Sequence, residues 1–226
     1  MRMPNKEDET LLKTLKIGVN PAIQAKLEQQ LYLNARKQDD AESCFSLALY
    51  HCILIPTIKD GQKQHKCLMD TIEWASRTVE KDKDHWPALF LRSMVRLMMN
   101  DEADEMAMYL LPMDYTEEDV MDDIDHMIEM QMSMSQPSSY CAVPYVELAY
   151  AKMLDEDPKA ALEVLNNASE HIKLEKMEYF ADVLRLPFMS LYKKAFYSHS
   201  SEILKVLKPW ISVLFPSVKF RTKGEK

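Results

Sequence analysis

The scarcity of glycine limits the fold more than any other feature of this sequence. The 226-residue chain contains three glycines, Gly18, Gly61 and Gly224. Tight β-hairpin turns need residues with positive φ, a conformation that glycine adopts at little cost. A sheet protein of this length would need many such turns, whereas helices can be joined by turns without glycine. The sequence therefore predicts an all-α protein.

Apolar residues recur at helical spacing along most of the chain, and polar breaks separate the segments. Asp39-Asp40 offer an N-cap for the second long helix, and Asp60-Gly61 mark a turn. Ser135 to Ser139 form the clearest loop. We expect helices over about 21–37, 44–53, 62–81, 86–99, 102–111, 116–134, 143–155, 158–173, 179–197 and 200–215, the last interrupted by Pro209.

The predicted organisation is one helical domain with short extensions. Residues 1–19 read as a polar segment with a short helix, 20–218 as a single domain, and 219–226 as a frayed basic tail. Successive helices joined by short breaks describe either a bundle or a solenoid of helical hairpins.

Residues 142–174 carry the one family signature. The run resembles a tetratricopeptide repeat, which places an aromatic, a leucine and a small residue on its first helix and small and apolar residues on its second. Those roles fall on Tyr145, Leu148, Ala149, Ala161, Leu165 and Ala168. Small residues let two helices approach closely where they cross. The family's late aromatic and terminal proline are replaced by Lys152 and Lys173. The resemblance implies a short solenoid of stacked antiparallel hairpins.

In this family the first helix of each repeat lines a concave binding groove. The resemblance places Val146, Tyr150 and Met153 on that surface. These residues differ from the Lys, Arg and Asn set with which family members clamp acidic chaperone tails, so that partner is disfavoured. Two alternatives stay open: the groove accepts an apolar helix or strand of a partner, or the chain's own C-terminal helices fill it.

The middle of the chain is strongly acidic. No Lys or Arg occurs between Arg96 and Lys152, whereas basic residues outnumber acids from residue 172 onward. An acidic face of this kind fits a basic protein partner, with an attraction that salt weakens. The alternative is a solvated helix face that keeps the protein soluble. The candidate contact residues are Glu118, Asp119, Asp122 and Asp123.

The same carboxylates support a different class of function. On a helix, Asp119, Asp122 and Asp123 would share a face, as in the Mg²⁺ sites of all-α isoprenoid synthases. That chemistry also needs basic residues near the site and a second acidic motif, and the sequence places neither nearby. A small Mg²⁺-dependent enzyme is thus the alternative function, and a regulatory subunit of a larger assembly is a third.

Other metal sites are disfavoured. Met130, Met132 and Met134 suggest a Cu(I) site, but a spacing of two spreads side chains around a helix. Methionine as an adaptable filler of cores or interfaces explains them better. An EF-hand is excluded because its loop needs a glycine that is missing here. We therefore expect a non-enzymatic protein without cofactors.

Charge, cysteines and hydropathy suggest location and partners. The net charge of −8 disfavours nucleic acid as a partner. The four cysteines are far apart and contain no CxxC pair, which is typical of a reducing compartment. No apolar run is long enough to cross a bilayer. We expect a cytoplasmic adaptor or scaffold that binds another protein, with self-association left open.

Overall fold

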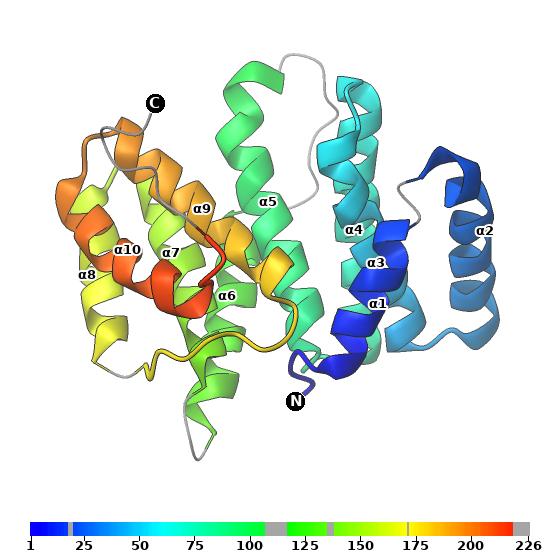
Figure 1. Ribbon diagram of the computed structural model, residues 1–226, viewed down its shortest axis with the longest axis horizontal. Coiled ribbons are helices and arrows are strands. Elements are labelled where there is room, and N and C mark those ends of the chain that lie inside the picture. Colours follow the sequence, from blue (N-terminus) through cyan, green and yellow to red (C-terminus); the bar gives the residue numbers. More distant parts are fainter. Residues whose placement is uncertain (18–19, 107–116, 135–137, 171, 219–226) are drawn as a thin grey trace. The chain divides into compact units, whose positions relative to one another are not determined.

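The computed structural model describes residues 1–17, 20–106, 117–134, 138–170 and 172–218, and these residues form ten α-helices (Figure 1). Within them we find no β-strand, only an isolated bridge between Arg2 and His85. The all-α prediction is confirmed. The helices are α1 (Lys6–Ile17), α2 (Pro21–Gln38), α3 (Ala41–Leu54), α4 (Gly61–Lys81), α5 (Trp86–Met106), α6 (Glu117–Met132), α7 (Ala142–Leu154), α8 (Pro158–Ser169), α9 (Ala181–Tyr197) and α10 (Ser201–Leu214).

Three aspartates fix where helices begin. The side chain of Asp40 accepts a hydrogen bond from the Ser43 amide at 2.7 Å and caps α3. Asp60 and Asp157 cap α4 and α8 in the same way. Each cap satisfies an amide that has no partner inside its helix. The predicted cap at Asp39-Asp40 is therefore present, with Asp39 ending α2 in a left-handed conformation.

The chain divides into two compact units, residues 1–130 and 131–226, instead of the expected single domain over 20–218. The expected separate segment 1–19 also belongs to the first unit, because Leu12 and Leu15 of α1 are buried. The predicted tail at 219–226 lies outside the described residues.

Helix α3 forms the centre of the first unit. It contacts α1, α2, α4 and α5, and almost every side chain from Ser43 to Cys52 is buried. An apolar sequence on all sides of a helix requires neighbours on all sides. The unit's largest fully buried side chains include Phe45, Leu47, Leu49, Tyr50, Trp86 and Phe90.

A charged network fastens the N-terminal segment to this core. The guanidinium of Arg2 donates two hydrogen bonds of 2.6 Å to Asp8, which is 1% exposed, and others to Glu42. The Arg2 amide also donates to the carbonyl of Asp84. The nearby imidazole of His85, 3.5 Å away, together with Arg2, lowers the pKa of the Glu42 carboxyl to about 2. Charge pairing and hydrogen bonding thus account for the burial of Asp8.

The second unit contains two helical hairpins. Helix α7 contacts α8, and α9 contacts α10, while α7 also contacts α9 and α8 contacts α10. Only three residues join α7 to α8, so these packed helices run antiparallel. An extended segment after α8 is fastened by the Ser139 hydroxyl, which donates to the Lys173 carbonyl and accepts from the Glu175 amide.

Several helix boundaries differ from those predicted. Helix α5 continues through Asn100 to Met106, because the residues that follow Asn100 include no helix breaker. Helix α10 is continuous through Pro209, which is exposed, and α8 ends at Ser169 instead of about 173. Thr116 and residues 107–111 of the predicted helix at 102–111 lie outside the described residues.

Candidate functional site

The candidate site is the outward side of α6. Asp119, Asp122, Asp125 and Glu129 are exposed there, and we call these four residues the acidic face. Glu118 belongs to the same helix, but its side chain lies outside the described part of the structure. Positions 122, 125 and 129 follow helical spacing, and Met132, 68% exposed, continues their row. The helix therefore presents three carboxylates and a thioether along one strip.

Asp123 does not belong to this face. Its side chain is 3% exposed and lies against α5, where Nε of Arg92 donates to one carboxylate oxygen at 2.8 Å. Nη2 of Arg92 donates to the other oxygen, and Nη1 of Arg96 lies 3.4 Å from the first. The prediction that Asp119, Asp122 and Asp123 share a face is wrong, because Asp123 turns toward the core to meet two cations.

This ion network attaches α6 to its neighbours. Arg92 also lies 3.3 Å from the hydroxyl of Ser76 on α4, so a single guanidinium links α4, α5 and α6. A bidentate pair between arginine and a carboxylate fixes geometry as well as charge. A second contact joins the imidazole of His126 on α6 to the carboxylate of Asp84 at 3.1 Å.

The same ion pairs argue against the alternative function, a Mg²⁺-dependent enzyme that uses these carboxylates. Both carboxylate oxygens of Asp123 accept hydrogen bonds from arginine, so they are not available as metal ligands. Arg92 and Arg96 are distant from these acids in the sequence because they belong to another helix, α5. Within the described residues, no group of three His, Cys, Asp or Glu side chains is arranged to hold a metal ion.

The methionines considered as Cu(I) ligands differ in their exposure to solvent. Met130 is 7% exposed, whereas Met132, two residues later, is 68% exposed. These two thioethers lie on different sides of α6, as spacing of two on a helix requires. Met130 therefore contributes to the core and Met132 to the surface.

The predicted groove is not open to solvent. Val146, Tyr150 and Met153 are at most 4% exposed on α7, which packs against α8 and α9. The prediction that they form a partner-binding surface is wrong, because all three side chains are buried. Of the repeat signature, Ala149, Ala161, Leu165 and Ala168 are fully buried, and Tyr145 and Leu148 are half-buried.

The structure also reveals a polar cluster that the sequence did not predict. His51 of α3 lies 3.2 Å from the hydroxyl of Tyr32 on α2, and its other ring nitrogen lies 3.7 Å from Asp70 on α4. Burial lowers the pKa of His51 and raises the pKa values of Tyr32 and Asp70. A tyrosine activated as a nucleophile would show the opposite shift. The cluster therefore links three helices and does not resemble a catalytic relay.

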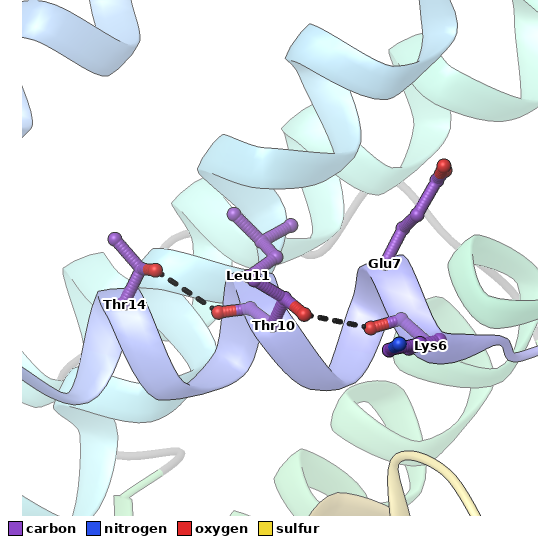
Figure 2. A pocket seen from close by; sticks show the side chains of 5 residues that line it. All are labelled: Lys6, Glu7, Thr10, Leu11 and Thr14. Carbon is purple, nitrogen blue, oxygen red and sulfur yellow. Dashed lines mark hydrogen bonds between the residues drawn. The ribbon is translucent and has the colours of Figure 1, made fainter.

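A shallow hollow lies along α1. Figure 2 shows its lining residues, Lys6, Glu7, Thr10, Leu11 and Thr14, and its volume is about 550 Å³. The hydroxyls of Thr10 and Thr14 donate to carbonyls of their own helix, at 2.9 and 3.0 Å. Few polar groups remain to orient a ligand, which a small-molecule site requires.

Comparisons with protein-family models, with curated proteins and with solved structures found no match to this chain. In the described part of the chain, no helix has the length and apolar character needed to cross a membrane.

Proposed function

We propose that this chain is a non-enzymatic adaptor of stacked helical hairpins that binds a basic protein partner through the acidic face of α6. The observation that carries the proposal is the charge of a single sign on the exposed face of α6. From Glu117 to Met132 the helix contains no Lys or Arg, and its carboxylates at 119, 122, 125 and 129 are exposed.

This charge pattern is unfavourable for the isolated helix. Asp122 and Asp125 repel each other at i, i+3, and Asp125 and Glu129 do so at i, i+4, at about 0.2–0.5 kcal/mol per pair. Glu129 also lies in the last turn, near the negative end of the helix dipole. A face that only keeps the protein soluble would gain stability from interspersed lysines. A basic partner removes the repulsion, which supports a binding role.

The packing of the second unit supports the repeat architecture. The first helices of its two hairpins, α7 and α9, contact each other, and so do the second helices, α8 and α10. Stacking of like helices is the arrangement expected of helical repeats. Since Val146, Tyr150 and Met153 are buried, the proposed contact surface is the acidic face and not a groove on α7.

A cytosolic location fits this proposal. All four cysteines are free thiols, and Cys44, Cys52 and Cys141 are buried. A reducing compartment keeps such thiols reduced. Met132 adds an exposed apolar group beside the carboxylates, which suits a contact surface in which methionine adapts to its partner.

Affinity capture from native lysate with a charge-reversed variant tests the proposal. We expect the wild-type chain to retain a basic protein at low salt and to lose it at about 0.5 M salt, where screening shortens the reach of exposed charges to a few ångströms. Asp122→Lys/Asp125→Lys/Glu129→Lys should lose that protein at both salt concentrations.

The control variant makes the same change in net charge elsewhere. Glu163, Glu170 and Glu178 are exposed and lie outside α6, so Glu163→Lys/Glu170→Lys/Glu178→Lys should retain the partner. Equal loss in both triple variants would show that net charge alone governs the capture, and the acidic face would then have no specific role.

A further inference from the structure

The second unit carries a surface of opposite charge to the acidic face. At the end of α9, Phe196 is 55% and Tyr197 is 70% exposed, and Lys193 is exposed one turn earlier. On α10, Lys205 and Lys208 are exposed. Figure 1 shows α9 and α10 side by side. We call these five residues the basic aromatic surface.

Side-chain contacts join Lys208 to the two aromatic residues of this surface. The ammonium group of Lys208 lies 5.9 Å from the ring centroid of Tyr192, which stacks on Phe196 at 6.5 Å. The ring of Phe196 in turn meets that of Tyr197 edge-on at 5.7 Å. The row of side chains therefore runs from a lysine on α10 to two aromatic rings at the end of α9.

The corner that presents these rings is well braced. Between α9 and α10 the Ser200 amide donates to the Ala195 carbonyl at 2.9 Å, and the hydroxyls of Ser198 and Ser200 lie 3.0 Å apart. These hydrogen bonds brace the backbone that carries the two rings, and most of the area of Phe196 and Tyr197 faces water. Clustered exposed aromatic side chains are characteristic of surfaces that bind other molecules.

We propose that the basic aromatic surface binds the acidic face of α6 in a second copy of this chain. The inference rests on the proposed role of the acidic face and names a partner for it. The two surfaces match in charge and in their apolar parts. Lys193, Lys205 and Lys208 oppose carboxylates at 122, 125 and 129, and the exposed thioether of Met132 meets aromatic rings, a favourable contact for sulfur.

Because the two surfaces differ, the contact is heterologous. Each copy offers one acidic face and one basic aromatic surface, so the assembly either closes with a small number of copies or extends as a row. The measured mass of the associated species distinguishes these two forms. Both depend on attraction between exposed charges and weaken as salt rises.

Sedimentation velocity of the full chain is the first test. At about 0.05 M salt the sedimentation coefficient should rise with protein concentration, and at about 0.5 M salt it should stay at the monomer value. A wild-type chain that remains monomeric at low salt and high concentration overturns the inference.

Variants with reversed charges test whether these two surfaces make the contact. The acid-reversed variant is Asp122→Lys/Asp125→Lys/Glu129→Lys, and the base-reversed variant is Lys193→Glu/Lys205→Glu/Lys208→Glu. Each alone has two surfaces of like charge and should sediment as a monomer. An equimolar mixture restores attraction at both surfaces and should associate at least tenfold more tightly than either variant alone. Failure of the mixture to associate, or association of either variant alone, overturns the inference.

The outcomes also separate this inference from the proposed function. A monomeric wild type that still captures a basic protein through α6 contradicts only self-association. A wild type that self-associates, and whose base-reversed variant captures no basic protein, contradicts only the adaptor proposal. Replacing Phe196 and Tyr197 by serine should weaken self-association at least tenfold, whereas the control Glu163→Lys/Glu170→Lys/Glu178→Lys should leave it unchanged.

Discussion

Replacing Asp123 by alanine should destabilise the first unit by about 3–5 kcal/mol, the range measured when one partner of a buried ion pair is removed. Asp123 is 3% exposed, and its carboxylate accepts hydrogen bonds from Arg92 and Arg96 of α5. Without it, two largely buried guanidinium groups lose their counter-charge, and α6 loses its ion pairs with α5. The better helix propensity of alanine offsets less than about 1 kcal/mol of this loss.

The neighbouring residue provides a matched control. Asp122→Ala makes the same chemical change on the same helix at an exposed position, and should alter the unfolding free energy by no more than about 0.5 kcal/mol. Denaturant titration followed by tryptophan fluorescence measures both variants. Trp210→Phe as a background restricts the signal to Trp74 and Trp86 of the first unit. Equal stability of the two variants would contradict the assignment of Asp123 as an ion-pair anchor.

Replacing Ala149 or Ala161 by tryptophan should destabilise the second unit by roughly 1–3 kcal/mol or more, because the added ring has no space. Both alanines are fully buried, one on each helix of the α7–α8 hairpin. A small side chain there allows the two helices to pack closely, and a large one forces them apart. Far-UV circular dichroism during denaturant titration measures the loss.

The control for this substitution is Ala25→Trp. Ala25 is exposed in the interior of α2, so the same change adds a large ring without displacing any packed atom. We expect a cost below about 1 kcal/mol, from helix propensity alone. If Ala149→Trp and Ala161→Trp unfold at the same denaturant concentration as Ala25→Trp, the α7–α8 hairpin does not pack through these alanines.

Local features of the fold were predictable because their causes lie close together in the sequence. The cap at Asp40 needs only the amide of Ser43, three residues later, and the turn at Asp60-Gly61 is equally local. The hairpin over α7 and α8 follows from apolar and small residues at helical spacing, together with a proline at the first position of α8. None of these features requires knowledge of distant segments.

The contacts between distant segments were not predictable in the same way. Asp70 approaches His51 only because α3 and α4 pack together, and Asp123 meets Arg92 only because the fold brings the side chains of α5 within reach of α6. No local feature of the sequence distinguishes Asp123 from the acidic residues beside it. Likewise, the repeat pattern identified Val146 as a groove residue, whereas the packing of distant segments leaves its side chain fully buried.

The acidic face was predictable in part from the sequence. The absence of Lys and Arg between Arg96 and Lys152 indicated an acidic surface, and exposure of Asp119, Asp122, Asp125 and Glu129 gives it a definite location. Its boundary required the structure, which moves Asp123 to the interior and adds Met132 to the exposed row. Charge patterning thus indicated the helix, and packing determines which of its side chains a partner can reach.

Site-specific photo-crosslinking from the acidic face tests the binding claim most directly. A benzophenone side chain placed at position 122 reports what touches α6, and the same group at exposed position 163 on α8 is the control. We predict that position 122 yields adducts with proteins that carry basic surfaces, that these adducts disappear at about 0.5 M salt, and that position 163 does not form them. Adducts that are the same from both positions, or none from position 122, would contradict the account.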